Sequence, residues 1–159
     1  MQKITPFLWF EHNCEEALNF YTSIFKNSRI VSIKRYPEGP LEEPMKGMEG
    51  KILTAVFEIE GQTFMALDGG KAFKPSGVVS FLVDCKDQTE IDYYWDKLSE
   101  GSDPTTHQCG WLQDKYGFWW QITPQMEKWL SSKDDEKSKR AMKAMLKMKK
   151  IIIKDLENA

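Results

Sequence analysis

The chain has no excess of either charge, since its 159 residues carry 22 Lys and Arg against 24 Asp and Glu, a net charge of -2. A surface that neutralises nucleic-acid phosphates needs a clear basic excess, so we expect no nucleic-acid partner. Long apolar runs are also missing, and no stretch reaches the ~18 residues that a membrane span needs. Residues 1–6 lack the apolar core of a signal peptide, so we expect a cytoplasmic protein with no membrane partner.

Cysteine and histidine are scarce as well, with three Cys and two His in the whole chain. Cys14, Cys85 and Cys109 show no CxxC spacing, which favours reduced thiols over a disulfide framework or a zinc site. His107 and Cys109 are only two positions apart in a polar loop, a spacing that does not match the usual metal-ligand patterns. We expect both His12 and His107 to be exposed loop residues without a catalytic partner.

Aromatic residues, by contrast, are abundant: they make up 13% of the chain and include six Trp and nine Phe. A chain this rich in large apolar side chains can bury a sizeable core, which excludes wholesale disorder. The length suits one domain, or two small halves that share a core.

Two helices are predicted by the same pattern of residues. Asn13 and Asp87 are each a good N-cap, and each is followed three residues later by Glu. Apolar residues then recur at helical spacing in both segments. The matching positions lie 74 residues apart, which indicates an internal repeat. The pairs are Asn13 with Asp87, Ala17 with Ile91, Phe20 with Tyr94, Tyr21 with Trp95, and Ile24 with Leu98.

Apolar segments around each helix predict β-strands. In the first half they span 7–10, 29–36, 52–60 and 62–67, and in the second half 78–83, 108–113 and 118–123. Each half therefore consists of a strand, a helix and up to three antiparallel strands, and neither has enough apolar surface to be stable alone. We predict one α+β domain over 1–124, made of halves 1–74 and 75–124.

The tail, residues 125–159, has a different composition. We predict a short helix over 125–130, a Lys-rich helix capped by Asp134 or Asp135, and a small strand at 151–153. The apolar stripe of the Lys-rich helix consists of Ala141, Ala144, Met145 and Met148, widened by Met142. We expect this stripe to pack against the domain or a second copy rather than form a membrane or nucleic-acid surface, because Met commonly fills adaptable interfaces.

Several short motifs recur in an order and spacing that are more specific than any one of them. They are Ile4–Phe10, Cys14–Ala17, Phe20-Tyr21, Ala66–Gly70, Val79–Phe81, Asp87-Gln88, Glu90–Asp92, Tyr94-Trp95, Cys109–Leu112 and Asp114–Ile122. Together they resemble the vicinal oxygen chelate superfamily, which has the fold of glyoxalases, bleomycin resistance proteins and the extradiol (dihydroxybiphenyl) dioxygenases. The closer resemblance is to its PhnB-like branch, the 3-demethylubiquinone-9 3-methyltransferase domain family.

The resemblance implies two βαβββ repeats forming a cup-shaped mixed sheet, with a C-terminal helical extension and pairing into a homodimer. Metal enzymes of the superfamily hold a divalent ion with His and Glu side chains, one pair from each half. Carried over by position, these ligands fall at or near Pro6, at Met65 or Ala66, at Ser80 or Val78, and at Gln121. These residue types cannot assemble such a site, so we expect neither a metal nor another cofactor.

The leading hypothesis is therefore a cup that binds a small aromatic or oxygen-bearing ligand without a metal. The expected polar contacts are Gln121, Ser80 and Asp68, and the expected stacking surfaces are Trp119, Trp9 and Trp111. Strand alternation places Gln121 on one face with Trp119. Core packing is the alternative for each tryptophan, and a solvated or backbone-bonded amide is the alternative for Gln121.

The alternative hypothesis is an enzyme, either a metal-dependent lyase, isomerase or dioxygenase, or a methyltransferase as in the name of the family. The first group needs metal ligands that the sequence does not provide. A methyl donor is usually bound by a Gly-rich turn that leads into a helix. Here Asp68-Gly69-Gly70 follows a hairpin strand and leads into 71–75, which favours a turn or rim loop. The sequence leaves enzymatic activity open and assigns no catalytic residue.

Overall fold

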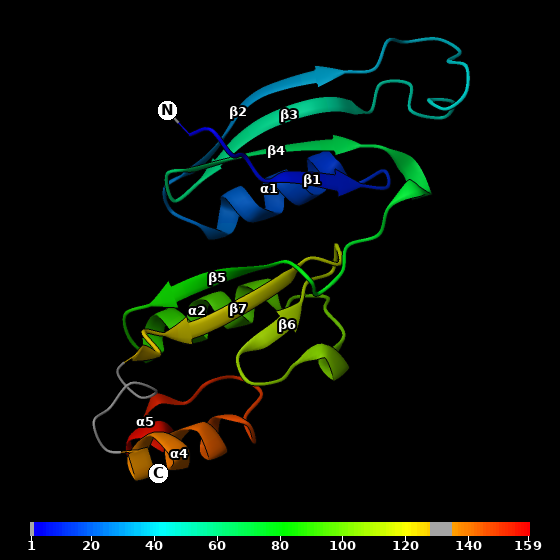
Figure 1. Ribbon diagram of the computed structural model, residues 1–159. Helices are drawn as coiled ribbons and strands as arrows, with labels where there is room; N and C mark the ends of the chain where they lie inside the picture. Colours follow the sequence, from blue (N-terminus) through cyan, green and yellow to red (C-terminus); the bar gives the residue numbers. More distant parts are fainter. Residues whose placement is uncertain (1, 128–134) are drawn as a thin grey trace. The chain divides into compact units, whose positions relative to one another are not determined.

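The computed structural model describes residues 2–127 and 135–159, which form two compact units that meet in sequence between Pro75 and Ser76 (Figure 1). The elements of the first unit are β1 (Phe7–Phe10), α1 (Cys14–Ile24), β2 (Ser28–Arg35), β3 (Ile52–Ile59), β4 (Gln62–Asp68) and a 3-10 turn (Gly70–Ala72). Those of the second unit are β5 (Ser80–Cys85), α2 (Gln88–Leu98), a 3-10 turn (Pro104–Thr106), β6 (Trp111–Gln113), β7 (Trp119–Pro124), α4 (Asp135–Met145) and α5 (Ile153–Glu157). The predicted α+β class is confirmed.

The first unit is a four-stranded mixed sheet with α1 packed on one face (Figure 1). The strand order is β1-β4-β3-β2, with β1 parallel to β4 and the other pairs antiparallel. Residues on the helix-facing side are buried: Leu8, Phe10, Ala55, Phe57, Phe64 and Ala66 from the strands, and Ala17, Leu18, Tyr21 and Ile24 from α1. Each of the larger side chains contributes about 1.5–3 kcal/mol by leaving water.

The second unit has a three-stranded sheet in the order β5-β7-β6, with β5 parallel to β7 and β6 antiparallel to it. Its buried face packs on α2, and the core residues are Leu112, Trp120, Ile122, Ile91, Trp95 and Leu98. Between α2 and β6 the chain forms a 3-10 turn and one isolated bridge, from Gln108 to Trp111, where the first unit has a full strand. Gly101 and Pro104 lie in this stretch, and both residue types disfavour a regular β-strand.

The two helices confirm the predicted internal repeat. They begin at Cys14 and Gln88 and end at Ile24 and Leu98, so both ends are 74 residues apart. The predicted cap at Asp87 is present, since its carboxylate accepts the N–H of Glu90 at 3.0 Å. Asn13 also occupies the predicted N-cap position of α1, but its side chain makes no capping hydrogen bond. A carboxylate from β4, described below, accepts the first N–H of α1 instead.

The tail is fastened to the second unit by backbone and amide hydrogen bonds. The N–H groups of Cys109 and Gly110 donate to the carbonyls of Met148 and Lys149, at 2.9 and 2.7 Å. The side chain of Gln88 bonds both the carbonyl of Ile151 and the N–H of Ile153, at 3.1 and 2.8 Å. The predicted strand at 151–153 is therefore wrong, because Gln88 occupies these backbone groups and α5 begins at Ile153.

The apolar side of α4 faces α5: Ala141 is buried, and Ala144, Met145 and Met148 are half-buried. The predicted helix over 125–130 and the predicted cap at Asp134 or Asp135 fall on or beside residues outside the described part of the chain. Within the described residues, no helix is long and apolar enough to cross a membrane. The three cysteines are free thiols, and Cys14 and Cys85 are buried.

Candidate functional site

The second sheet has one face that points away from α2. Because side chains alternate along a strand, the register assigns eight residues to this face. Asp84 and Thr123 are paired at one end of the face, and the other six residues are called the open face below. They are Ser80 and Leu82 from β5, Trp111 and Gln113 from β6, and Trp119 and Gln121 from β7. Five of the six are half-buried, and Leu82 is 59% exposed. The open face thus brings together four of the residues that sequence reasoning placed in a ligand site.

At the centre of the open face, Gln121 and Ser80 form a hydrogen bond. Nε2 of Gln121 donates to Oγ of Ser80 at 2.8 Å. Within the described part of the chain, no partner occupies Oε1 of Gln121 or the hydroxyl proton of Ser80. An amide oxygen accepts and a hydroxyl donates, so the pair presents one acceptor and one donor side by side.

Trp111 and Trp119 are neighbours of this pair in the sheet, since Trp119 lies opposite Ser80 and Trp111 lies opposite Gln121. Their ring centroids are 6.5 Å apart with an interplanar angle of 63°, an edge-to-face contact. Buried indole N–H groups usually find a partner, and Trp120 and Trp9 follow this rule by donating to Oδ2 of Asp114 and to the carbonyl of Gly70, at 2.8 and 2.9 Å. By contrast, the indole N–H groups of Trp111 and Trp119 have no acceptor among residues 2–127 and 135–159. Both rings therefore have a polar edge available to a ligand.

The hairpin between β6 and β7 is held by Asp114, which is 4% exposed. Its Oδ1 accepts the N–H groups of Tyr116 and Phe118, at 2.9 and 3.0 Å, and its Oδ2 accepts the indole N–H of Trp120. Gly117 completes the turn with a φ of +92°, a conformation that favours glycine. The predicted hairpin is confirmed, and Asp114 fixes the strands that carry Trp111, Trp119 and Gln121.

Asp68 and Trp9 belong to the first unit and lie on opposite faces of its sheet, because the register pairs Phe10 with Asp68 and Trp9 with Leu67. Asp68 is 2% exposed. Its Oδ1 accepts the N–H of Cys14 at 2.9 Å, and its Oδ2 accepts the N–H of Ile52 at 3.0 Å. Both oxygens therefore have structural roles: Oδ1 caps the N-terminus of α1, and Oδ2 fixes the start of β3.

Trp9 packs directly on the Gly69-Gly70 loop. A Cβ at Gly69 would overlap the indole ring, so only glycine permits this approach. The edge of the ring also meets Phe73, with centroids 4.9 Å apart at 87°. The loop continues into the 3-10 turn from Gly70 to Ala72 and does not lead into an α-helix. The indole ring thus covers this loop on the side where a side chain of residue 69 would lie.

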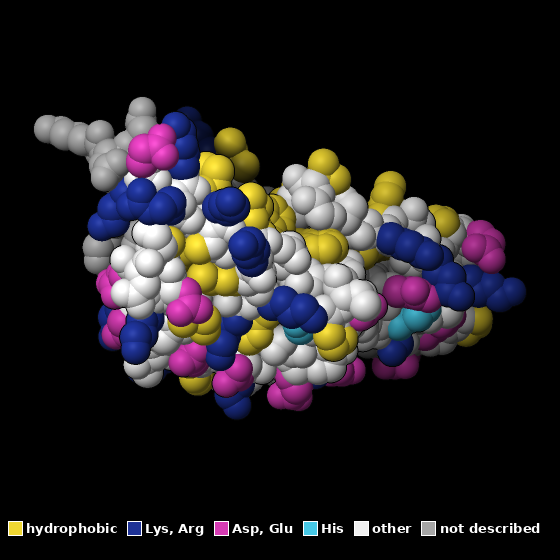
Figure 2. All heavy atoms as spheres, turned by 90° about the horizontal axis from the view of Figure 1, so that it is seen from below, with side chains coloured by type: hydrophobic (Ala, Val, Ile, Leu, Met, Phe, Trp, Pro, Cys, Tyr) yellow, Lys and Arg dark blue, Asp and Glu magenta, His cyan; other side chains and the backbone are white. Residues whose placement is uncertain are grey.

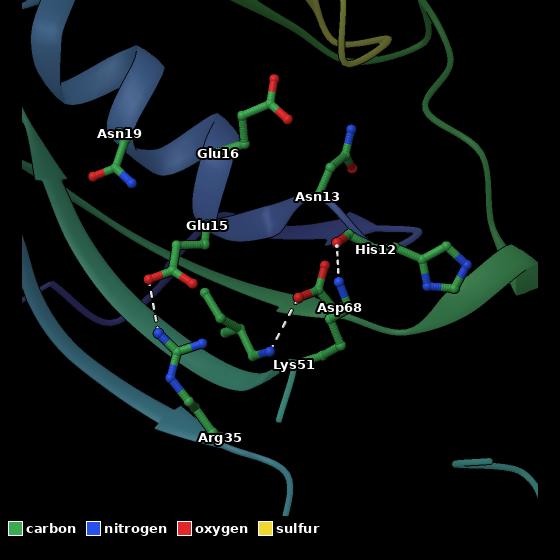
Figure 3. A pocket seen from close by; sticks show the side chains of 9 residues that line it. His12, Asn13, Glu15, Glu16, Asn19, Arg35, Lys51 and Asp68 are labelled. Carbon is green, nitrogen blue, oxygen red and sulfur yellow. Dashed lines mark hydrogen bonds and ion pairs between the residues drawn. The ribbon is translucent and has the colours of Figure 1, made fainter. Parts of the chain in front are cut away.

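A pocket of about 380 Å³ in the first unit was missed by sequence reasoning (Figure 3). Its lining residues are His12, Asn13, Glu15, Glu16, Asn19, Arg35, Lys51, Ile52 and Asp68. Arg35 and Glu15 form an ion pair at 2.7 Å, and the hydrogen bond from Arg35 lowers the pKa of the Glu15 carboxyl. Arg35 and Lys51 flank the Pro- and Gly-rich loop 37–50, so the antiparallel pairing of β2 and β3 could have placed them together.

The two histidines differ in their surroundings. His12 has a 47% exposed side chain 3.5 Å from Glu11, which confirms an exposed loop position. The same expectation is wrong for His107, which is half-buried: its ring packs edge-on against Trp95 at 5.2 Å, and Nε2 lies 2.8 Å from Oγ of Ser102. Burial and the nearby charge of Lys149 lower the pKa of His107. The loop after α2 folds back over the helix, which its polar sequence did not indicate.

The donor set does not fit the divalent metal site of the superfamily. Among residues 2–127 and 135–159, no three His, Cys, Asp or Glu side chains lie close enough together to hold a metal ion. Ser80 and Gln121, which stand at two of the carried-over ligand positions, are bonded to each other. Hydroxyl and amide groups are weak ligands beside imidazole and carboxylate.

Comparison with known proteins agrees with the motifs. The sequence pattern of the 3-demethylubiquinone-9 3-methyltransferase family matches residues 2–123. A PhnB protein from Bacillus cereus of known structure is 41% identical, and the match covers 77% of this chain and 99% of that chain with a TM-score of 0.65. Protein PA1353 from Pseudomonas aeruginosa shares the fold at 22% identity, with 76% and 95% of the two chains covered and a TM-score of 0.59. No curated protein matches.

Proposed function

This chain belongs to the PhnB-like 3-demethylubiquinone-9 3-methyltransferase family, and we propose that it binds a small aromatic or oxygen-bearing molecule on the open face without a divalent metal. The observation that carries the proposal is the Gln121–Ser80 hydrogen bond, which leaves one acceptor and one donor beside Trp111 and Trp119. A planar molecule with neighbouring oxygens can stack on an indole ring and bond both groups.

The six residues of the open face include no ionisable side chain, and the exposed carboxylate of Asp84 lies farther along the same side of β5. These groups favour a ligand that carries no negative charge. An aromatic contact contributes about 0.5–1.5 kcal/mol beyond the area that it buries. Each hydrogen bond adds about 0.5–1.5 kcal/mol net of water. These gains are partly offset by the translational and rotational freedom that the ligand loses, so we expect weak binding.

Binding is proposed ahead of catalysis because neither enzymatic alternative finds its usual groups. A metal-dependent lyase, isomerase or dioxygenase needs a set of donors that Ser80 and Gln121 do not supply. A methyl donor is usually bound by a Gly-rich turn that leads into a helix, whereas Gly69-Gly70 leads into a 3-10 turn of three residues. The homodimer and the cytoplasmic location remain predictions, and light scattering of the purified protein tests the first by its mass.

A thermal-shift screen tests the proposal, because a ligand specific to the native state raises the melting temperature. The protein is first dialysed against a chelator and then mixed with a panel of planar aromatic and dicarbonyl compounds, with catechol as the first probe. At 100 times its dissociation constant, a ligand should raise the melting temperature by about 5–10 °C. S-adenosylmethionine in the same screen should give no shift.

Variants then locate the bound molecule. Gln121→Ala and Ser80→Ala should each remove most of the shift, whereas Gln62→Ala, at an exposed position of the first unit, should retain it. A shift that survives both open-face substitutions would place the ligand elsewhere. A shift that requires added metal would overturn the metal-independent part of the proposal.

A further inference from the structure

The tail of the second unit concentrates the positive charge of the chain. Residues 137–154 hold eight Lys and Arg and no acidic residue. The remaining residues hold 14 Lys and Arg against 24 Asp and Glu, so the segment carries +8 and the rest of the chain -10. An asymmetry of this size within a chain is typical of attraction to an anionic surface.

Several of these charges have no counter-ion in the structure. Lys139 pairs with Glu136 and Lys150 with Asp92, each at 2.8 Å. Within the described residues, four others form no ion pair: Lys143, Lys147, Lys149 and Lys154. Surface pairs such as Lys139–Glu136 are weak and exchange readily with other partners.

Part of the segment forms an amphipathic surface. Lys139, Met142, Lys143 and Leu146 recur at i, i+3, i+4 and i+7, which aligns them on one side of α4. The N–H of Leu146 bonds the carbonyl of Met142 at 3.0 Å, so the helical geometry continues to the end of this series. All four side chains are exposed, with Met142 at 47% and Leu146 at 57%. We call these four residues and the exposed Lys147 the basic strip.

Figure 2 looks from below onto this end of the second unit, where Lys and Arg side chains lie beside hydrophobic ones. The side of α4 that faces α5 is a separate surface, since Ala141 there is 1% exposed. The exposed Met142 and Leu146 are therefore additional to the packing of the tail on its own unit. Two large apolar side chains among lysines form a surface that is both cationic and able to insert into an apolar layer.

We propose that the basic strip docks on the surface of an anionic lipid bilayer. Lysines near an anionic leaflet each strengthen binding by about fivefold. Met142 and Leu146 would enter the boundary between headgroups and acyl chains, as the apolar faces of interfacial helices do. Residues 1–124, which precede the tail, carry 12 Lys and Arg against 18 Asp and Glu, a net charge of -6 that would keep their surfaces away from the leaflet, so docking would have one orientation. The expectation of no membrane partner came from the lack of long apolar runs and of a signal peptide, and neither feature is needed for a helix that docks on the membrane surface.

Two other anionic partners fit the strip less well. Nucleic acids favour the planar fork of Arg, whereas seven of the eight cations in 137–154 are Lys. Exposed Met and Leu side chains also have no role against a phosphate backbone. An acidic peptide would need a groove for its apolar side chains, and the strip lies on the convex surface of a helix.

Co-sedimentation of the full chain with vesicles tests the proposal, independently of the open face. Vesicles of phosphatidylcholine and phosphatidylglycerol in a 60:40 ratio should bind the protein in 50 mM salt. Binding should fall at least tenfold in 500 mM salt, and also with vesicles of phosphatidylcholine alone, because exposed charges are screened or absent. No binding to the anionic vesicles would overturn the proposal.

Two charge-reversal variants with the same net charge distinguish the strip from overall charge. Lys143→Glu with Lys147→Glu should weaken vesicle binding at least tenfold. Lys26→Glu with Lys34→Glu changes two exposed lysines of the first unit, which form no ion pair with described residues, and should stay within twofold. Equal losses in the two variants would overturn the proposal.

The apolar part of the strip and the competing ligand need their own measurements. Met142→Ser with Leu146→Ser should weaken vesicle binding several-fold, and an unchanged affinity would exclude insertion. The competing ligand is a single-stranded oligonucleotide, measured in 50 mM salt. The proposal would be overturned in favour of a nucleic acid if the oligonucleotide bound more tightly than the vesicles and the Lys143→Glu, Lys147→Glu variant lost that binding. Circular dichroism measures the melting temperature of each variant. A melting temperature equal to that of the wild-type protein shows that a loss of binding is not caused by unfolding.

Discussion

Gln121 donates a hydrogen bond from Nε2 to Oγ of Ser80 at 2.8 Å, between the parallel strands β7 and β5. Two of the metal-ligand positions carried over from the superfamily fall on these residues. The hydrogen bond creates a neutral polar pair there, next to the unsatisfied indole edges of Trp111 and Trp119. The open face is thus suited to hydrogen bonding and stacking rather than to coordination of a cation.

The first prediction concerns metal content. Protein purified without chelator should contain well under one divalent ion per chain by elemental analysis, because hydroxyl and amide groups at Ser80 and Gln121 are weak ligands. Chelator treatment should leave the melting temperature unchanged, since a metal bound to the native state would have stabilised it. One ion per chain that survives purification would contradict this.

A second prediction concerns Asp68. Asp68→Ala should lower the free energy of unfolding by about 2–5 kcal/mol, because the buried N–H groups of Cys14 and Ile52 lose their acceptor. Urea denaturation measures the loss. The control is Asp84→Ala, an exposed carboxylate on β5, which should cost no more than about 0.5 kcal/mol. Similar losses in the two variants would mean that Asp68 has no special structural role.

A third prediction separates two tryptophans by their hydrogen bonds. Trp120→Phe should lower the free energy of unfolding by about 1–3 kcal/mol, because it leaves Oδ2 of the buried Asp114 without the indole donor. Trp111→Phe should cost less than about 0.5 kcal/mol, since that indole N–H bonds no described residue. Chemical denaturation measures both losses in the free energy of unfolding. Equal losses would contradict a structural role for the Trp120 hydrogen bond that Trp111 lacks.

A fourth prediction is a dependence of stability on alkaline pH. Burial raises the pKa of the Cys85 thiol from 9.0 to about 12. Above pH 9 the unfolded thiol loses its proton while the folded one keeps it, so the free energy of unfolding falls as the pH rises from 9 toward 12. Cys85→Ala should reduce this slope between pH 8 and 10.5 in urea denaturation.

Cys109→Ala is the matched control for this slope, because that side chain is only half-buried. It should leave the alkaline decline of the wild-type protein unchanged. If Cys85→Ala also left the decline unchanged, the buried thiol would not be its source.

Local signals made much of the fold predictable. The caps and helical spacing located α1 and α2 at the correct offset, because a helix is specified largely by its own residues. The turn residues from Asp114 to Gly117 located the hairpin for the same reason. Alternation along β7 placed Gln121 on the same side as Trp119 before any register was known.

Features that depend on distant partners were not predictable. Asp68 was expected to contact a ligand, but the N–H groups that its carboxylate bonds are 54 and 16 residues away in sequence. Likewise, Gln88 lies 65 residues from the N–H of Ile153 and redirects an apolar segment with a strand-like composition into α5. Such contacts follow from tertiary packing, which overrides local propensity.

The most direct test of ligand binding on the open face is a two-dimensional ¹⁵N NMR titration of the indole N–H signals in chelator-treated protein. The titrant is the panel compound that raises the melting temperature most. The signals of Trp111 and Trp119 should move together with one dissociation constant, while that of Trp120, bonded to Asp114, should stay in place. Stationary Trp111 and Trp119 signals during saturable binding would contradict a ligand site on the open face.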